Sequence, residues 1–428
     1  MCRLRGVVAG HRASPAGLLG DDLDRFLAVA PENRHRWGIG WVDDNRRIAI
    51  SSEPRPTQGS ALLAARLAGT RTDAAVLHLR LASSGLDPVL SSYTRGQSVE
   101  FARNEAYEWE PGCAWHTGPA YLDRFDLKAV TESSVRQGGL QSHQFDRVAA
   151  VAPANLARTA KDPKLKLLTH ENSGINHVLL LNTWLAPIEN LKVRRAFQSS
   201  ISVEDMVKAV FFDYARAADG LFGPATQYHD ALVPGQWGHD LDKAARLLDE
   251  AGWTARDADG YRTKDSVRLT VQLTYSDEEA TAEEQTIYQA AAQQAKLAGF
   301  EVKLQTNARA AQTEIESRGD YDITGLFHVR AEPDIARTFF SGSFVLPNGT
   351  NYARVQDPTL EELPEKGLAT PDGADREVVY RQVQQRVIAQ AYVMPTYVPF
   401  GRIAVQNGVE GAAFATNSTP LFYDTWKH

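Results

Sequence analysis

The sequence predicts an α/β protein, and three observations support that fold class. Hydrophobic residues make up 43% and charged residues 23% of the 428 residues, which is typical of a soluble globular chain. At about 150 residues per folding unit, the length suggests roughly three units. Residues 240–304 have the pattern of helix, strand, helix and strand, and this alternation is typical of helices packed on a parallel sheet.

The clearest helix is expected over residues 241–251, in the stretch DLDKAARLLDEAGW. Its apolar residues fall at i, i+3, i+4, i+7 and i+10, which is one face of a helix. Asp240 can cap the first turn, and the glycine that follows suits a helix end where φ is positive. Residues 267–275 alternate between apolar and polar, which predicts a half-buried strand. A helix over 278–298 and a strand over 300–304 complete the crossover.

Five further elements are expected outside this segment. Helical spacing of apolar residues predicts helices over 193–210 and 376–391. Residues 396–405 are rich in β-branched and aromatic residues and are expected to form a strand. Two strand-like runs, 47–50 and 74–81, lie before a change of sequence texture close to the Gly-Leu-Asp-Pro stretch.

The charge balance excludes several classes of function. Lysine and arginine number 46 against 53 acidic residues, for a net charge of −7, so a nucleic-acid partner is not expected. No run approaches the roughly 18 apolar residues of a membrane-spanning helix. The first twenty residues lack the apolar core of a signal peptide, so the chain as written is expected to be soluble and cytoplasmic.

Cysteine and histidine usage argues against disulfides and metals. The two cysteines, Cys2 and Cys113, cannot form a disulfide framework, and neither lies in a CxxC motif. His170 and His177 are seven residues apart in HENSGINH, where they are expected to flank a turn rather than to bind a metal. We therefore expect no metal site and no cofactor.

Seven stretches of the sequence, in a fixed order, carry a family resemblance. They are SSYTRGQSVEFARNEAY, PAYLDRFDLKAV, LNTWLAPIENLKVRRAFQSSISVEDMVKAVF, DLDKAARLLDEAGW, LAGFEVKL, GDYDITGLF and AYVMPTYVPFGRIAV. From about residue 89 to 428, the chain resembles the peptide/nickel (family 5) class of ABC-transporter solute-binding proteins. The resemblance covers about four-fifths of the chain.

The resemblance implies a two-lobed, periplasmic-binding-protein-like clamshell that catalyses nothing. It would close on an oligopeptide or another small solute and deliver it to ABC permease subunits, as a monomer outside the cytoplasm. Residues 87–178 would form part of lobe I, residues 179–326 lobe II, and residues 327–428 would return to lobe I. The sequence as written shows no signal peptide, no lipidation cysteine and no large N-terminal block of lobe I. The first lobe is therefore expected to be incomplete, and peptide binding is expected to be weak or absent.

The resemblance also indicates residues of the cleft. Relatives that bind free peptides hold the peptide amine with an acid shortly before an Asp-Pro, and the corresponding stretch here is GLFHVRAEPDIARTFF. Arg330 stands where that acid would be, with Glu332 and Asp334 close by, which favours a ligand other than a free-amine peptide. The alternative is a hinge crossing with solvated charges. Candidate cleft aromatics, each more often a core residue, are Trp184, Tyr228, Trp237 and Phe344.

Residues 1–86 resemble a second family, the class II glutamine amidotransferases, whose fold is a small α+β N-terminal-nucleophile hydrolase. MCRLRGVVAG places Cys2 directly after the initiator Met, whose removal would make Cys2 the N-terminal residue. An α-amino group has a reference pKa of about 7.7–8.0, low enough to serve as base for the adjacent thiol. The stretch HRWGIGW resembles that family's strand behind the nucleophile, and HLRLASSG resembles its His-x-Arg-x-Ala-Ser segment, whose arginine holds the glutamine carboxylate. Arg80 would hold the glutamine carboxylate; the alternative is a surface arginine at a strand end.

The amidotransferase-like segment departs from its family after Gly85, since no Asn-Gly oxyanion element follows. One oxyanion donor is worth about 10²–10³ in turnover, so glutaminase activity is expected to be near background. The chain thus resembles two truncated domains fused near residues 86–89. The readings left open are a solute-binding protein, a glutamine amidohydrolase, and an inert fusion.

Overall fold

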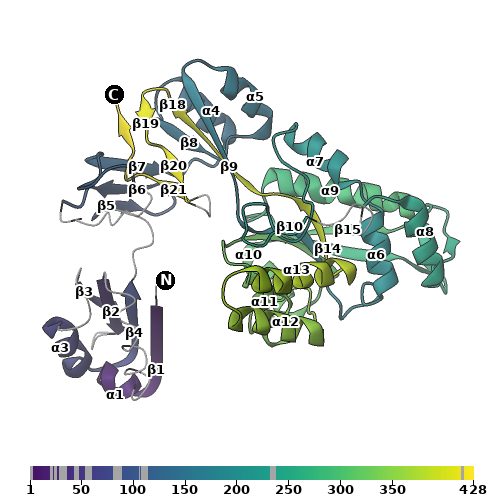
Figure 1. Cartoon of the computed structure of the whole chain (residues 1–428), viewed down its shortest axis with the longest axis horizontal. Helices are drawn as coiled ribbons and strands as arrows, with labels where there is room; N and C mark the ends of the chain where they lie inside the picture. Colours follow the sequence, from purple (N-terminus) through teal and green to yellow (C-terminus); the bar gives the residue numbers. More distant parts are fainter. Residues whose placement is uncertain are drawn as a thin grey trace. The chain divides into compact units, whose positions relative to one another are not determined.

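The computed structural model describes residues 3–19, 23, 27, 36–42, 48–53, 60–80, 89–105, 107, 114–231, 238–415 and 419–428. These residues fall into two compact units, drawn in Figure 1. Unit 1 comprises residues 1–129, 410–413 and 421–428, and unit 2 comprises residues 130–409 and 414–420.

Unit 1 begins with a four-stranded antiparallel sheet in the order β1-β4-β2-β3. Its helices α1 and α3 pack on the sheet, and Trp37, Ile39, Leu63 and Leu67 form a small buried core. An antiparallel meander, β5-β6-β7, follows. The elements are β1 (Arg3–Ala13), α1 (Pro15–Leu19), β2 (Arg36–Val42), β3 (Ile48–Glu53), α3 (Ala61–Gly69), β4 (Thr72–Arg80), β5 (Val89–Thr94), β6 (Ser98–Ala102) and β7 (Arg124–Lys128).

The C-terminal residues of unit 1 pack on the segment around its meander. Phe125 stacks between Phe101 and Phe422, with ring centroids 4.8 and 4.5 Å away. His116 stacks on Tyr423 in the same way, at 4.6 Å. The last strands of the chain are two residues each: β19 (Val409–Glu410), β20 (Ala413–Phe414), β21 (Pro420–Leu421) and β22 (Trp426–Lys427).

Unit 2 is built around a five-stranded sheet in the order β15-β14-β16-β10-β17. Strand β14 runs parallel to β15 and β16, whereas β10 runs antiparallel to β16 and β17. The parallel crossover expected from the sequence is confirmed as β14-α9-β15 (Figure 1). The elements around this sheet are β10 (Gly174–Leu181), α6 (Leu191–Ser199), α7 (Val203–Phe211), α8 (Leu241–Glu250), β11 (Ala255–Arg256), β12 (Arg262–Lys264), β13 (Val267–Arg268), β14 (Thr270–Ser276), α9 (Ala282–Ala298), β15 (Glu301–Asn307), α10 (Arg309–Arg318), β16 (Ile323–Val329), α11 (Ile335–Phe340), the 3-10 helix η2 (Gly342–Phe344), α12 (Pro358–Ala369), α13 (Ala374–Ala389) and β17 (Val393–Tyr397).

Helices cover both faces of this sheet, and β10 is therefore buried along its whole length. Leu179 and Leu181 point into a core shared with α6, α7, α8 and α9. Val178 and Leu180 point to the other face, into a core shared with α11, α12 and α13. A strand covered on both faces has a nearly continuous apolar sequence, as GINHVLLL does.

A three-stranded sheet, β8-β18-β9, forms the rest of unit 2. Its core includes Leu140, Val148, Leu156 and Ala404. The elements are α4 (Ser133–Gln141), β8 (Arg147–Ala149), α5 (Pro153–Lys161), β9 (Leu165–Glu171) and β18 (Phe400–Gln406). The chain crosses between the two sheets twice, after β9 and after β17.

Two expected elements differ from the structure. The helix expected over residues 193–210 is two helices, α6 and α7, because Ser202 N–H donates to Gln294 of α9 at 2.5 Å and the chain turns there. The strand expected over residues 396–405 is divided between β17 and β18, which belong to different sheets. Both differences depend on contacts with residues far along the chain.

The expected lobe boundary at residue 326 does not coincide with a break in this architecture. Residues 327–397 contribute α11, α12 and α13 to one face of the five-stranded sheet and β17 to its edge. The chain passes to the three-stranded sheet only after Tyr397. Among the described helices, none has the length and apolarity needed to cross a membrane.

Candidate functional site

The two crossings between the sheets of unit 2 lie side by side. Asn172 N–H donates to the Pro399 carbonyl at 2.8 Å, which ties the first crossing to the second. Val398 N–H donates to the Arg216 carbonyl at 3.0 Å, which ties the second crossing to the segment after α7. A pair of short adjacent crossings is the place where two bodies can pivot with few changes in φ and ψ.

Gly174 brings the first crossing against the end of β16. Its φ is +111°, and a Cβ there would lie 2.1 Å from the His328 carbonyl oxygen. One hydrogen bond holds this approach, since Arg330 N–H donates to the Ser173 carbonyl at 3.2 Å. Gly174 N–H donates to the Thr226 hydroxyl at 2.7 Å, which ties the crossing to the segment after α7. Only glycine fits this backbone position.

The end of β16 carries an unpaired positive charge. Arg330 is exposed, and its guanidinium makes no ion pair or hydrogen bond with any described residue. The neighbouring His328 packs its ring 5.4 Å from that of Phe339, and burial together with the charge of Arg330 lowers the pKa of His328. This end of the strand is therefore suited to an anionic group.

The two acids that follow Arg330 are neutralised within the protein. Glu332 pairs with Arg376 of α13 at 2.5 Å. Asp334 is buried and pairs with Arg337 at 3.1 Å, and the Tyr380 hydroxyl donates to it at 3.4 Å. Of the three charged candidates from the sequence, Arg330 alone keeps an unpaired charge among the described residues.

A pocket of about 190 Å³ opens beside the crossings. Its lining comes from the end of β9, the segment after α7 and the start of β18, and includes His170, Glu171, Tyr214, Arg216 and Phe400. Glu171 and Arg216 form an ion pair at 3.7 Å across it. The pocket therefore presents both signs of charge and an aromatic ring where the two sheets are joined.

The sequence did not indicate a buried polar cluster next to the second crossing. The Thr396 hydroxyl donates to the His177 carbonyl at 2.9 Å, so its oxygen accepts from Nδ1–H of the same histidine at 2.6 Å. The Tyr288 hydroxyl then donates to the bare Nε2 at 3.3 Å. Neutral imidazole satisfies both bonds, and burial lowers the pKa of His177 to about 3.

The aromatic cleft candidates are not brought together. Trp184 is 49% exposed and follows β10 at its Leu181 end, while Arg330 lies beside the Gly174 end of the same strand. At about 3.3 Å per residue, the length of β10 puts these two ends roughly 25 Å apart. Tyr228 stacks on Tyr380, and Phe344 lies 5.2 Å from the Arg337 guanidinium.

Two candidates, Cys2 and Trp237, lie outside the described residues. Arg80 ends β4, where its backbone pairs in register with Arg36 of β2. His170 and His177 lie on β9 and β10 and flank the first crossing. Among the described residues, no group of three or more His, Cys, Asp or Glu side chains is placed to hold a metal ion.

The fold is shared with solved binding proteins. The chain superimposes on NikA from Brucella suis, solved in complex with Fe(III)-EDTA, with a TM-score of 0.69 and 20% sequence identity, covering 79% of this chain and 67% of that one. The fold is therefore that of the periplasmic binding proteins.

Residues 42–337 match the family described as "Bacterial extracellular solute-binding proteins, family 5 Middle". The chain belongs to that family.

Curated relatives agree with this assignment. Heme-binding protein A of Haemophilus influenzae is 25% identical over 342 residues, which are 79% of this chain and 58% of that protein. Glutathione-binding protein GsiB of Salmonella paratyphi A is 25% identical over 292 residues, 66% of this chain and 54% of that protein. The chain thus spans little more than half the length of these relatives.

The family match begins at residue 42, within the segment that the sequence led us to expect as amidotransferase-like. The comparisons support the solute-binding part of that expectation and not the fused amidotransferase segment.

Proposed function

We propose that the chain captures a small solute between two lobes and delivers it to the permease of an ABC import system, outside the cytoplasm and as a monomer. The observation that carries this proposal is the pair of adjacent crossings in a chain of family 5, at residues 171–174 and 397–400. The five-stranded sheet belongs to one lobe and the three-stranded sheet to the other. A solute that contacts both favours the closed state over the open one.

The positive charge at the end of β16 favours solutes that carry an acidic group. Relatives are named for heme and for glutathione, so the family by itself leaves the ligand open. In this chain Arg330 offers an unpaired guanidinium, while Glu332 and Asp334 are occupied by Arg376 and Arg337. We therefore place an acidic group of the solute, rather than a free amine, against Arg330, because a guanidinium binds carboxylates with paired hydrogen bonds.

Two measurements test this function. Mass spectrometry of small molecules that co-purify with the chain identifies candidate solutes. Isothermal titration then compares those solutes, and a library of tripeptides with free or acetylated amino termini, on the wild type, Arg330→Gln and the control Arg309→Gln. Arg309 is an exposed arginine on α10.

We expect Arg330→Gln to weaken binding of acidic solutes at least tenfold and Arg309→Gln to leave it unchanged. Since peptide binding is expected to be weak, the solute-binding proposal is wrong only if nothing co-purifies and nothing in the library binds even weakly. If solutes bind equally well to Arg330→Gln, only the role of Arg330 is wrong.

For the N-terminal segment we propose descent from a class II glutamine amidotransferase, with turnover near background. The feature that supports this is β1, which begins at Arg3, directly after Cys2, in an antiparallel sheet flanked by α1 and α3. Ammonia release from glutamine by the wild type and by Cys2→Ala tests it. A large difference between the two would show an active glutaminase and overturn the proposal.

A further inference from the structure

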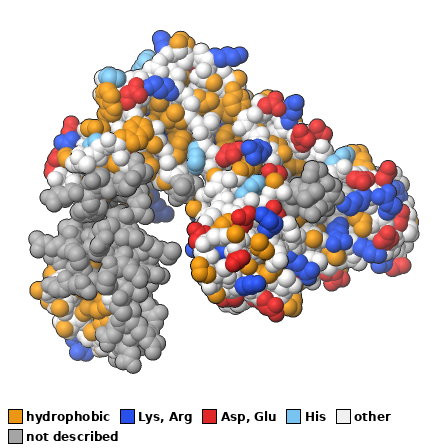
Figure 2. Space-filling view, in the orientation of Figure 1, with side chains coloured by type: hydrophobic (Ala, Val, Ile, Leu, Met, Phe, Trp, Pro, Cys, Tyr) orange, Lys and Arg blue, Asp and Glu red, His pale blue; other side chains and the backbone are white. Residues whose placement is uncertain are grey.

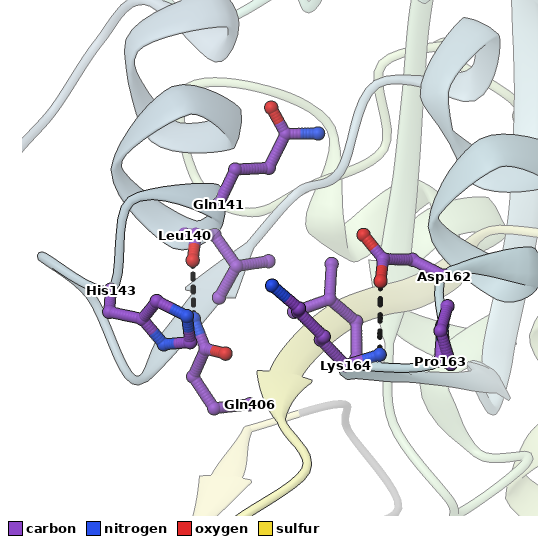
Figure 3. A pocket seen from close by; sticks show the side chains of 8 residues that line it. Leu140, Gln141, His143, Asp162, Pro163, Lys164 and Gln406 are labelled. Atoms are coloured by element: carbon purple, nitrogen blue, oxygen red, sulfur yellow. Dashed lines mark hydrogen bonds between the residues drawn. The ribbon is translucent and has the colours of Figure 1, made fainter.

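A pocket of about 310 Å³ opens on the three-stranded part of unit 2 (Figure 3). It lies between the end of α4, the turn that leads into β9, and Gln406 at the end of β18. Strand β18 spans residues 400–406, so at about 3.4 Å per residue Gln406 lies roughly 20 Å along the strand from the crossings. The pocket is therefore separate from the solute site proposed above. Its volume is at the small end of the range of about 300–1,000 Å³ for ligand sites.

Gln406 places a hydrogen-bond acceptor in this pocket. The residue is 6% exposed, and its Nε2 donates to the Leu140 carbonyl and to the Phe145 carbonyl. Since both partners are acceptors, the orientation of the carboxamide is fixed. Its Oε1 accepts from no described residue, and Figure 3 shows this oxygen directed away from the Leu140 carbonyl. This oxygen is open to the pocket, so a ligand in the pocket can donate a hydrogen bond to it.

The facing wall supplies charges of both signs. The Lys164 ammonium makes no ion pair or hydrogen bond with any described residue, and Figure 3 shows it extending toward the side that holds His143 and Gln406. One oxygen of Asp162 accepts from the Lys164 backbone N–H at 3.0 Å, which holds the carboxylate at the pocket. His143 ends the turn after α4 with φ of +60°, and its ring completes the lining.

We propose that this pocket binds a small zwitterion of the size and charge pattern of a free α-amino acid. The carboxylate of the ligand pairs with Lys164 and accepts from His143. The ammonium donates to Gln406 Oε1 and to Asp162. A short aliphatic side chain contacts Pro163 and the partly accessible edge of Leu165, which supply apolar surface to the lining.

The donor set excludes simpler ligands. A simple anion would leave Gln406 Oε1 without a donor and would lie near the Asp162 carboxylate. A simple amine would pair with Asp162 but would leave the Lys164 ammonium without an anionic partner. A zwitterion meets both requirements at once, since its two charged groups are separated by two bonds across one carbon.

Isothermal titration and thermal unfolding of the full chain test the proposal, with L-alanine and L-valine as probes. Acetate and methylamine serve as the two half-ligands. We expect the amino acids to bind and to raise the unfolding temperature, because a ligand that binds only the folded state stabilises it. Acetate and methylamine alone should bind at least tenfold more weakly than either amino acid.

The variants are Lys164→Met and His143→Asn, the second chosen because asparagine tolerates positive φ. The matched control is Lys161→Met, an exposed lysine of α5 that does not line the pocket. Lys164→Met should weaken amino-acid binding at least tenfold, His143→Asn should weaken it less, and Lys161→Met should not change it. Three results would each overturn the proposal. They are absence of binding at 20 mM amino acid (on the order of the weakest useful affinities), unchanged affinity in Lys164→Met, and acetate that binds as tightly as alanine.

Discussion

At the scale of single residues, the least expected feature is the neutral, fully buried His177. Its two ring nitrogens are matched to a threonine oxygen that accepts and a tyrosine hydroxyl that donates. A proton added to Nε2 would face the Tyr288 hydroxyl, and Glu284 lies 3.9 Å away as the nearest carboxylate. Burial raises the pKa of that glutamate, which weakens its ability to stabilise a charged imidazole.

This arrangement makes the stability of unit 2 depend on pH. The pKa of His177 is about 3 in the folded protein and about 6.5 in the unfolded chain, so below pH 6.5 the unfolded chain binds the extra proton. Its contribution to stability is therefore present above about pH 6.5 and is lost as the pH falls. Between pH 7 and 5.5 we expect the wild type to lose about 1 kcal/mol relative to His177→Phe in urea unfolding.

The comparison with His177→Phe is needed because the protonation of another group changes the free energy of unfolding in the opposite direction as the pH falls. Burial raises the pKa of Asp322 to about 6, so that carboxyl group takes up its proton in the folded state first and offsets the loss in mild acid. Asp322 is present in both proteins and cancels in the difference. His239→Gln, a change at an exposed histidine, should behave like the wild type; a pH-independent difference between wild type and His177→Phe would contradict the argument.

The residue scale also shows what a sequence can predict about a site. The stretch around Arg330 is identified by its resemblance to the segment in which relatives hold the peptide amine. The partner that neutralises Glu332 is Arg376, which lies 44 residues further along the chain. No local sequence pattern predicts the pairing of Glu332 with Arg376. The net charge at the end of β16 depends on that pairing, so the sequence alone does not give this charge.

At the scale of elements, local signals were sufficient where an element is specified by its own residues. The helix expected over residues 241–251 is α8, and its cap is the expected Asp240, whose side chain accepts from Lys243 N–H at 2.8 Å. The helix expected over 278–298 starts later, at Ala282, because Thr281 and Glu284 form a capping box there. The division between α6 and α7 was missed, since a contact with α9 creates it.

The start of β10 is an element boundary that depends on one glycine. In Gly174→Ala, the new Cβ would lie 2.1 Å from the His328 carbonyl oxygen, in a backbone conformation with φ of +111°. We expect this change to cost about 3 kcal/mol or more in urea unfolding, because neither backbone can yield without breaking the β10-β16 pairing.

A second glycine provides the control. Gly138 lies inside α4, and a Cβ there would meet nothing within 4 Å. Gly138→Ala should therefore stabilise the protein by about 0.5–1 kcal/mol, since alanine has the higher helix propensity. Equal effects of the two substitutions would show that the close approach at Gly174 is not a constraint.

At the scale of the whole molecule, charge and core organisation have different consequences. On the face drawn in Figure 2, cationic and anionic side chains are interspersed rather than gathered by sign, in agreement with a net charge of −7. Such a surface favours solubility over binding to a polyanion. The cores, in contrast, are divided: among the described residues, one small core belongs to the four-stranded sheet of unit 1, and three belong to unit 2.

The fold class could be predicted from the sequence because periodicity reports which faces are buried. The attachment of β17 has no such local record, because this strand joins the five-stranded sheet by pairing with β10, more than 200 residues earlier in the chain. Pairings over such separations are set by the whole core and leave no local signal in the strand itself.

Unit 2 is expected to fold without most of unit 1, because the three cores found among its described residues are made of its own side chains. We predict that a chain trimmed to residues 130–420 unfolds in one cooperative calorimetric transition. At about 0.7 kcal/mol per residue, its unfolding enthalpy should be on the order of 200 kcal/mol near 60 °C. The full chain should show the same transition within a few degrees, together with a separate, smaller one from unit 1. A trimmed chain without a cooperative transition would mean that unit 2 needs residues 1–129 to complete its cores, and the division into two independent folding units would then be wrong.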